Sequence, residues 1–220
     1  MIKRELYMNR IRPFIGGELI KVMTGIRRSG KSVMLELIKE ELAEAGVAPS
    51  QMISINFEDM RYSHLQTATA LHDEIIKRAE GIKGKAYLFF DEIQEVEGWE
   101  KCVNSLRVAL DCDIYITGSN AKLLSGELAT YIGGRYVEFV IYPFSFAEFL
   151  ELYHTIAPSD SIQQCFQKYL LAGGMPYLAN LRYEEEPSRQ YLTDLFNSVQ
   201  LKDIVKRNKI RDIDLLERII

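Results

Sequence analysis

The segment GIRRSGKS, residues 25–32, is the strongest indication of the fold of this 220-residue chain. It fits the pattern G-x-x-x-x-G-K-[ST], in which glycines let the backbone wrap closely and turn its N–H groups towards phosphate oxygens. An apolar run with Ile20, Val22 and Met23 precedes it, and a helical pattern follows. A phosphate-binding loop requires this order of strand, loop and helix. The sequence therefore predicts a nucleotide site, and the alternative is a glycine-containing turn with a surface lysine.

The loop residues have separate physical roles in this prediction. A helix beginning near Lys31 directs the positive end of its dipole at the phosphates. Lys31 adds a point charge on the β- and γ-phosphates, and the hydroxyl of Ser32 is a ligand for Mg²⁺. Arg27 and Arg28 either add charge near phosphate or pair with carboxylates elsewhere. We assign the nucleotide to Gly25, Ile26, Arg27, Arg28, Ser29, Gly30, Lys31, Ser32, Val33 and Ser119.

Two carboxylates, Asp91 and Glu92, follow the apolar strand AYLFF at residues 86–90. In P-loop proteins an Asp at such a strand end holds Mg²⁺, and an adjacent Glu orients and deprotonates the attacking water. Acid at both positions favours hydrolysis by water over transfer to a small molecule. A solvated strand end is the alternative. The predicted metal ligands are Ser32 and Asp91.

Two further segments carry candidate catalytic residues. The strand in ITGSN, residues 116–120, leads to Ser119 and Asn120 at the edge where ligands of parallel sheets gather. Asn120 alternatively caps a short helix. Arg135 follows two glycines and is expected to reach a phosphoryl group, in a neighbouring subunit; its alternative is a surface arginine paired with Glu138 or Glu127. The predicted catalytic residues are Glu92, Lys31, Asn120 and Arg135.

Alternating β-rich and helical patterns predict an α/β fold with a parallel sheet between helices. The expected strands are 19–24, 52–57, 86–90, 114–117 and 136–141. After Pro143 the pattern becomes helical, and Ser145 with Glu148 forms a capping box. We expect a P-loop core at residues 1–143, and a helical lid with the start of a winged-helix-like segment at residues 144–220. The chain stops in a helical pattern without a C-cap, so we expect a longer protein.

Composition excludes several classes of protein. The chain has 27 basic and 31 acidic residues, a net charge of −4, which is not typical of proteins that coat nucleic acid. Three cysteines without CxxC spacing predict neither a disulfide framework nor a zinc site. The N-terminus has no apolar signal region, and the longest apolar run, 86–90, is too short to span a bilayer. We expect a soluble cytoplasmic protein without a membrane partner.

The order of the motifs resembles a known family. GIRRSGKS, YLFFDEIQ (87–94), ITGSN (116–120), GGRYVEF (133–139) and PFSFAEFL (143–150) are similar to the AAA-like predicted ATPases of the archaeal-ATPase group. These belong to the P-loop branch with an additional catalytic glutamate. The resemblance implies a five-stranded sheet of order 5-1-4-3-2, ATP with Mg²⁺, a sensor at Ser119 and Asn120, and Arg135 as arginine finger. It also implies a further C-terminal domain, often nuclease-like in fold, and no nuclease activity in these 220 residues.

The leading hypothesis is Mg-ATP binding and hydrolysis that drives a conformational change in an attached helical or C-terminal domain. The alternatives are a slow nucleotide-dependent switch with negligible turnover alone and a small-molecule phosphotransferase, against which Glu92 counts. Expected partners are ATP and ADP, further copies of the chain with Arg135 acting in trans, and DNA or protein bound by the C-terminal segment. That segment carries Lys202, Lys206, Arg207, Lys209 and Arg211, a pattern also typical of a solvated helix face.

Overall fold

The computed structural model describes residues 2–118 and 132–199, and it divides the chain into two compact units. The boundary between them falls between Tyr142 and Pro143. Ser119, Asn120 and Glu127, together with the basic residues between positions 202 and 211, lie outside the described residues.

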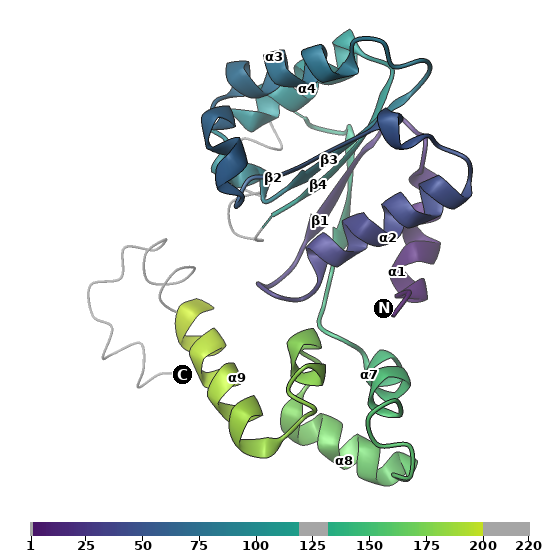
Figure 1. Ribbon diagram of the computed structural model, residues 1–220, viewed down its shortest axis with the longest axis vertical. Coiled ribbons are helices and arrows are strands. Elements are labelled where there is room, and N and C mark those ends of the chain that lie inside the picture. Colours follow the sequence, from purple (N-terminus) through teal and green to yellow (C-terminus); the bar gives the residue numbers. More distant parts are fainter. Residues whose placement is uncertain (1, 119–131, 200–220) are drawn as a thin grey trace. The chain divides into compact units, whose positions relative to one another are not determined.

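Within the described residues, five parallel strands form one sheet in the first unit, in the order β2-β3-β4-β1-β5 (Figure 1). Read from the other edge, this order is 5-1-4-3-2. The predicted α/β class and sheet order are therefore confirmed, and the predicted strand ends are correct to within two residues. The strands are β1 (Ile20–Thr24), β2 (Met52–Asn56), β3 (Ala86–Asp91), β4 (Cys112–Thr117) and β5 (Tyr136–Val140).

The helices of the first unit precede the first strand or lie between strands in the sequence, and they cover both faces of the sheet. The α-helices are α1 (Glu5–Ile11), α2 (Lys31–Glu44), α3 (Ala68–Ala79) and α4 (Trp99–Ala109). Short 3₁₀ turns are η1 (Arg12–Phe14), η2 (Pro49–Gln51), η3 (Met60–Leu65) and η4 (Ile93–Glu95). Figure 1 shows α3 and α4 on one face and α1 and α2 on the other.

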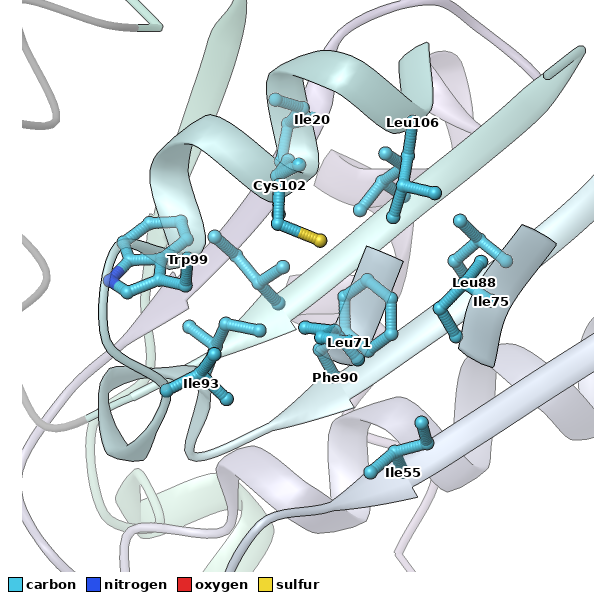
Figure 2. Packing of buried hydrophobic residues seen from close by; sticks show 14 of the residues in the cluster. Ile20, Ile55, Leu71, Ile75, Leu88, Phe90, Ile93, Trp99, Cys102 and Leu106 are labelled. Atoms are coloured by element: carbon cyan, nitrogen blue, oxygen red, sulfur yellow. The ribbon is translucent and has the colours of Figure 1, made fainter. Parts of the chain in front are cut away.

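Each face of the sheet has its own hydrophobic core, because successive side chains of a strand point to opposite faces. Leu88 and Phe90 of β3 join the cluster under α3 and α4, where Leu71 and Trp99 also lie (Figure 2). Phe89 between them belongs to the cluster under α1 and α2, where its ring stacks on that of Tyr115 with centroids 4.8 Å apart. Burial on both faces explains why the strands read as continuous apolar runs.

The three cysteines are free, as the sequence predicts. Burial raises the pKa of Cys102 to about 12 and that of Cys112 to about 11. The part of the chain that the structure describes holds no helix both long and apolar enough to cross a membrane.

The second unit begins at Pro143 and its described part is helical. It contains α7 (Phe146–Tyr153), α8 (Ile162–Ala172), η5 (Pro176–Ala179) and α9 (Glu185–Val199). The predicted capping box is present: the Ser145 hydroxyl accepts from the Glu148 amide, and the Glu148 carboxylate accepts from the Ser145 amide at 2.8 Å. A separate core forms around Phe149, Cys165 and Tyr183.

A close backbone approach explains the second glycine of the pair at positions 173 and 174. The Phe144 amide donates to the Gly174 carbonyl at 2.7 Å. A Cβ on Gly174 would lie 2.0 Å from the Phe144 oxygen, well inside contact distance, so only glycine fits there.

Candidate nucleotide site

The glycines of the loop between β1 and α2 are required by its geometry. A Cβ on Gly25 would lie 2.2 Å from the carbonyl oxygen of Ile141, and the φ of Gly25 is 143°. Gly30, the residue before α2, has a φ of 100°, which side chains rarely adopt. The loop conformation therefore demands glycine at both of the motif's glycine positions.

The amino end of α2 offers unbound amides. The first bond of the helix runs from the Met34 amide to the Gly30 carbonyl, at 3.1 Å, and no side chain of the described residues caps it at Gly30. The amides of the first turn precede this bond and have no partner within the helix. Ser32 and Val33 are exposed beside them. Such a helix end attracts an anion through its amides and its dipole.

Lys31 is buried but only loosely held. Its side chain is 4% exposed, and its Nζ lies 3.3 Å from the carbonyl oxygens of both Gly25 and Ile26. The nearest carboxylate oxygen in the part of the chain that the structure describes, Oε1 of Glu92, is 3.8 Å away. Burial lowers the pKa of Lys31, and the negative charges of Glu92 and Asp91 oppose that shift. The ammonium thus lies between the loop and the acidic strand end.

Asp91, the last residue of β3, is fixed by both neighbouring strands. Its Oδ1 accepts from the Thr117 hydroxyl at the end of β4, and its Oδ2 accepts from the Asn56 side-chain amide at the end of β2, at 3.1 Å. The Thr117 hydroxyl also accepts from the Glu92 amide, at 3.0 Å. Asn56 and Thr117 were not among the predicted site residues. The signal that would have found them is a polar residue at the end of an apolar strand.

Glu92 has a left-handed backbone, with a φ of 55° and a ψ of 47°. This conformation is uncommon for residues other than glycine and is concentrated at functional sites. The Gln94 side chain donates to Oε2 of Glu92, while Oε1 faces Lys31. The strand end therefore brings Asp91, Glu92 and Lys31 together.

The two loop arginines differ in their surroundings. Arg27 lies 3.6 Å from the carboxylate of Glu58, and both side chains are partly exposed. This contact supports the carboxylate-pairing alternative for Arg27. Arg28 is exposed and has a φ of 63°.

Arg135 lies at the other end of the sheet from the loop. It precedes β5, which runs parallel to β1 with Ile20 opposite Tyr136, and its carbonyl accepts from the Ile20 amide. The loop follows the far end of these five-residue strands, about 16 Å away at about 3.3 Å per residue. The structure therefore does not bring Arg135 together with Lys31 of the same chain.

The exposed Arg135 side chain contacts Asn104 at 3.3 Å. Glu138, one of its two alternative partners, instead accepts from the Thr24 hydroxyl at 2.6 Å. The other, Glu127, and the predicted sensor residues Ser119 and Asn120 lie outside the described residues.

The donors at this site fit magnesium and a polyphosphate. Mg²⁺ takes oxygen ligands and is bound in nucleotide sites by one or two protein oxygens together with phosphates. The anchored Asp91 carboxylate and the exposed Ser32 hydroxyl are such oxygens. In the described residues no group of three or more His, Cys, Asp or Glu is arranged to hold a metal ion.

Comparison with known proteins agrees with this geometry. A family model described as an AAA domain matches residues 18–150, which include the loop and the acidic strand end. The chain belongs to the AAA domain family. Membership of this family and its sheet order confirm the predicted AAA-like P-loop ATPase, and together they indicate nucleotide binding and hydrolysis.

Two curated relatives of this AAA domain are uncharacterised proteins. One, from Haemophilus influenzae, is 40% identical over 221 residues, covering 100% of this chain and 54% of the relative. The other, from Methanocaldococcus jannaschii, is 34% identical over 203 residues, covering 88% and 44%. The chain spans about half the length of the curated relatives it matches.

Two solved structures share the fold of the AAA domain. AMPPCP-bound DnaA from Aquifex aeolicus has a TM-score of 0.53 and 14% identity, covering 94% of this chain and 66% of that chain. The ORC1 protein of Aeropyrum pernix in complex with DNA has a TM-score of 0.50 and 14% identity, covering 91% and 66%. At this identity the likeness concerns the fold alone.

Proposed function

We propose that this AAA domain binds Mg-ATP at residues 25–32, hydrolyses it, and thereby drives a conformational change in the attached helical unit. One observation carries the proposal. Lys31 is buried between the carbonyls of the phosphate loop and the acidic end of β3, with its nearest carboxylate 3.8 Å away. A buried ammonium with such distant partners gains most from a close anion.

Each residue of the site has its own role in the proposed reaction. The amides of the loop and of the first turn of α2 bind phosphate oxygens, and Lys31 neutralises their charge. Ser32 and Asp91 would hold Mg²⁺, which neutralises charge on the phosphate oxygens when bound. Glu92, aimed by its left-handed backbone and by Gln94, accepts a proton from the attacking water.

The Glu92→Gln variant tests this proposal, with Glu95→Gln as the matched control on the adjacent turn η4. We expect Glu92→Gln to bind ATP as the wild type does, because the amide keeps the shape of the side chain. Its Mg²⁺-dependent turnover should fall by about 10²-fold or more, because an amide cannot accept the proton. The control should keep its turnover. Equal turnover in Glu92→Gln and wild type would remove the hydrolytic role of Glu92.

The position of Arg135 favours a second candidate, a nucleotide switch that turns over negligibly as a single chain. The arginine lies at the end of the sheet away from the loop, so hydrolysis assisted by it requires another subunit.

We therefore propose a homo-oligomer in which Arg135 acts in trans. An arginine supplied in trans is worth about 10³-fold or more in turnover.

Mixing two variants separates the candidates. Arg135→Ala and Lys31→Met subunits should each be inactive alone, and their mixture should regain turnover, because an intact Arg135 then reaches an intact loop. Turnover per wild-type subunit should also rise with protein concentration. ATP binding with negligible turnover at every concentration would instead identify the switch.

We also propose DNA or protein as a partner of the segment beyond α9. Five basic residues fall between positions 202 and 211, and the ORC1 structure that shares the fold was solved in complex with DNA. Binding of duplex DNA should weaken steeply with salt if these residues contact phosphates. DNA affinity that is absent or independent of salt would favour a protein partner.

A further inference from the structure

Both ends of the phosphate loop are linked to the two residues that precede the second unit, directly at its start and through Arg4 at its end. At the start of the loop, the Ile141 amide donates to the Thr24 carbonyl at 2.7 Å, and the Ile141 oxygen fills the space beside Gly25. At its end, the Ser29 carbonyl accepts from Nη1 of Arg4 at 2.9 Å. Nη2 of the same guanidinium donates to the carbonyl of Tyr142, the last residue of the first unit, at 2.8 Å.

Arg4 is held rigidly in this position. It is 2% exposed, has a left-handed backbone with a φ of 49°, and places its guanidinium 4.6 Å from the ring centroid of Tyr7. The Tyr7 hydroxyl in turn accepts from the Tyr142 amide at 3.1 Å. Both backbone polar groups of Tyr142 are thus bound by the segment at residues 4–7.

This arrangement suits arginine and no other side chain. The planar guanidinium presents donors in a fixed fork and can hold two carbonyls at a set spacing, whereas an ammonium is a point charge on a flexible stem. Displacement of the Ser29 carbonyl therefore moves a rigid, buried group whose other arm is bonded to Tyr142.

We infer that Arg4 couples the state of the phosphate loop to the main chain at Tyr142, the last residue before the second unit. This inference rests on the proposed nucleotide binding. Through Arg4, binding at the loop would change the main chain at Tyr142. Arg4 is a positioning residue, since its guanidinium binds the carbonyls of Ser29 and Tyr142.

Amide hydrogen exchange of the whole chain, with and without AMPPCP and Mg²⁺, tests this coupling in wild type and Arg4→Lys. Arg12→Lys is the matched control, because Arg12 ties the same N-terminal region to Glu41 in the body of α2. In wild type and control, the nucleotide should slow exchange several-fold in the loop and at Tyr142. In Arg4→Lys, the loop should still be protected and the response at Tyr142 should be lost.

The outcomes separate this inference from the proposed function. A protected loop with an unchanged Tyr142 response in Arg4→Lys, or with no Tyr142 response in wild type, overturns the coupling alone. An unprotected loop in wild type overturns nucleotide binding and the coupling with it. If Arg4→Lys does not fold, Tyr7→Phe removes only the acceptor of the Tyr142 amide and should weaken the nucleotide response there; an unchanged response contradicts the coupling.

Discussion

Two buried lysines lie near opposite ends of the same strand and differ in how they are bound. Lys21, near the start of β1, is fully buried, and Lys31, just beyond the loop that follows β1, is 4% exposed. A buried ammonium is costly unless it is paired and hydrogen-bonded. The partners of the two lysines offset this cost to very different degrees.

Lys21 is fully satisfied. Its Nζ is paired with the buried carboxylate of Asp113 and lies 3.2 Å from the Gly17 carbonyl. Asp113 also accepts from the Gly16 amide at 2.6 Å and from the Tyr115 hydroxyl at 2.7 Å. Each oxygen of the carboxylate therefore has a close donor, and both side chains are fully buried.

Among the described residues, Lys31 has only long contacts, to two carbonyls at 3.3 Å and to a carboxylate at 3.8 Å. Burial of a lysine therefore does not by itself indicate function. The two lysines differ in how close their partners are. At the amino end of the sheet, Lys21 forms a close ion pair with Asp113. At the carboxyl end, the ammonium of Lys31 can still bind a phosphate.

The largest expected effect is on stability, through Lys21→Met. Removing the cation leaves the Asp113 carboxylate buried without its counter-charge, so the free energy of unfolding should fall by about 3–5 kcal/mol. Urea denaturation measures this change. Lys31→Met, at the other end of the strand, is the matched variant and should change it by less than about 1 kcal/mol, since its ion pair is long. Equal losses in the two variants would show that Lys31 is a structural lysine.

The next effect is on nucleotide binding, through Lys31→Met. Loss of charge-assisted hydrogen bonds worth about 1.5–3 kcal/mol should weaken ATP binding by about 10- to 100-fold. Isothermal titration of ATP with Mg²⁺ measures it. Lys39→Met is the control on the same helix, because Lys39 pairs with Glu36 on the surface and should leave the affinity unchanged. Equal affinities of Lys31→Met and wild type would contradict the assignment of the loop.

The sequence predicts the strands and the phosphate loop because their signals are local. Strands buried on both faces read as apolar runs, and the loop needs glycines at positions where a Cβ would clash or strain the backbone, as at Gly25. The sheet order came from the resemblance to a family and not from spacing, since hydrophobic pattern does not say which strands are neighbours.

The contacts between strands could not be predicted for the same reason. Lys21 pairs with Asp113 because β1 lies beside β4 with Lys21 opposite Tyr115. Asn56 reaches Asp91 because these two residues are opposite each other in β2 and β3. Each requires the register of the sheet. Arg135 is different: its place before β5 puts it at the amino end of a parallel sheet, and its action in trans stays a prediction.

The smallest expected effect is the pH dependence of ATP binding, which depends on the charge of Lys31. Burial lowers the pKa of Lys31, and a bound phosphate raises it again, because a nearby negative charge favours the protonated form. The complex therefore holds the proton more tightly than the free protein does. Affinity should be constant below the lowered pKa and fall as the pH rises above it, by at most about tenfold per pH unit.

Lys31→Arg is the control for this profile, because a guanidinium stays charged throughout the accessible range. Its affinity should stay level between about pH 7 and about pH 10 even if it is weaker than that of wild type. Titrations of both proteins, with folding checked at each pH, give the comparison. Parallel profiles would mean that the charge of Lys31 does not change in this range. A falling wild-type profile beside a level Lys31→Arg profile would assign the titration to the loosely held lysine at the carboxyl end of the sheet.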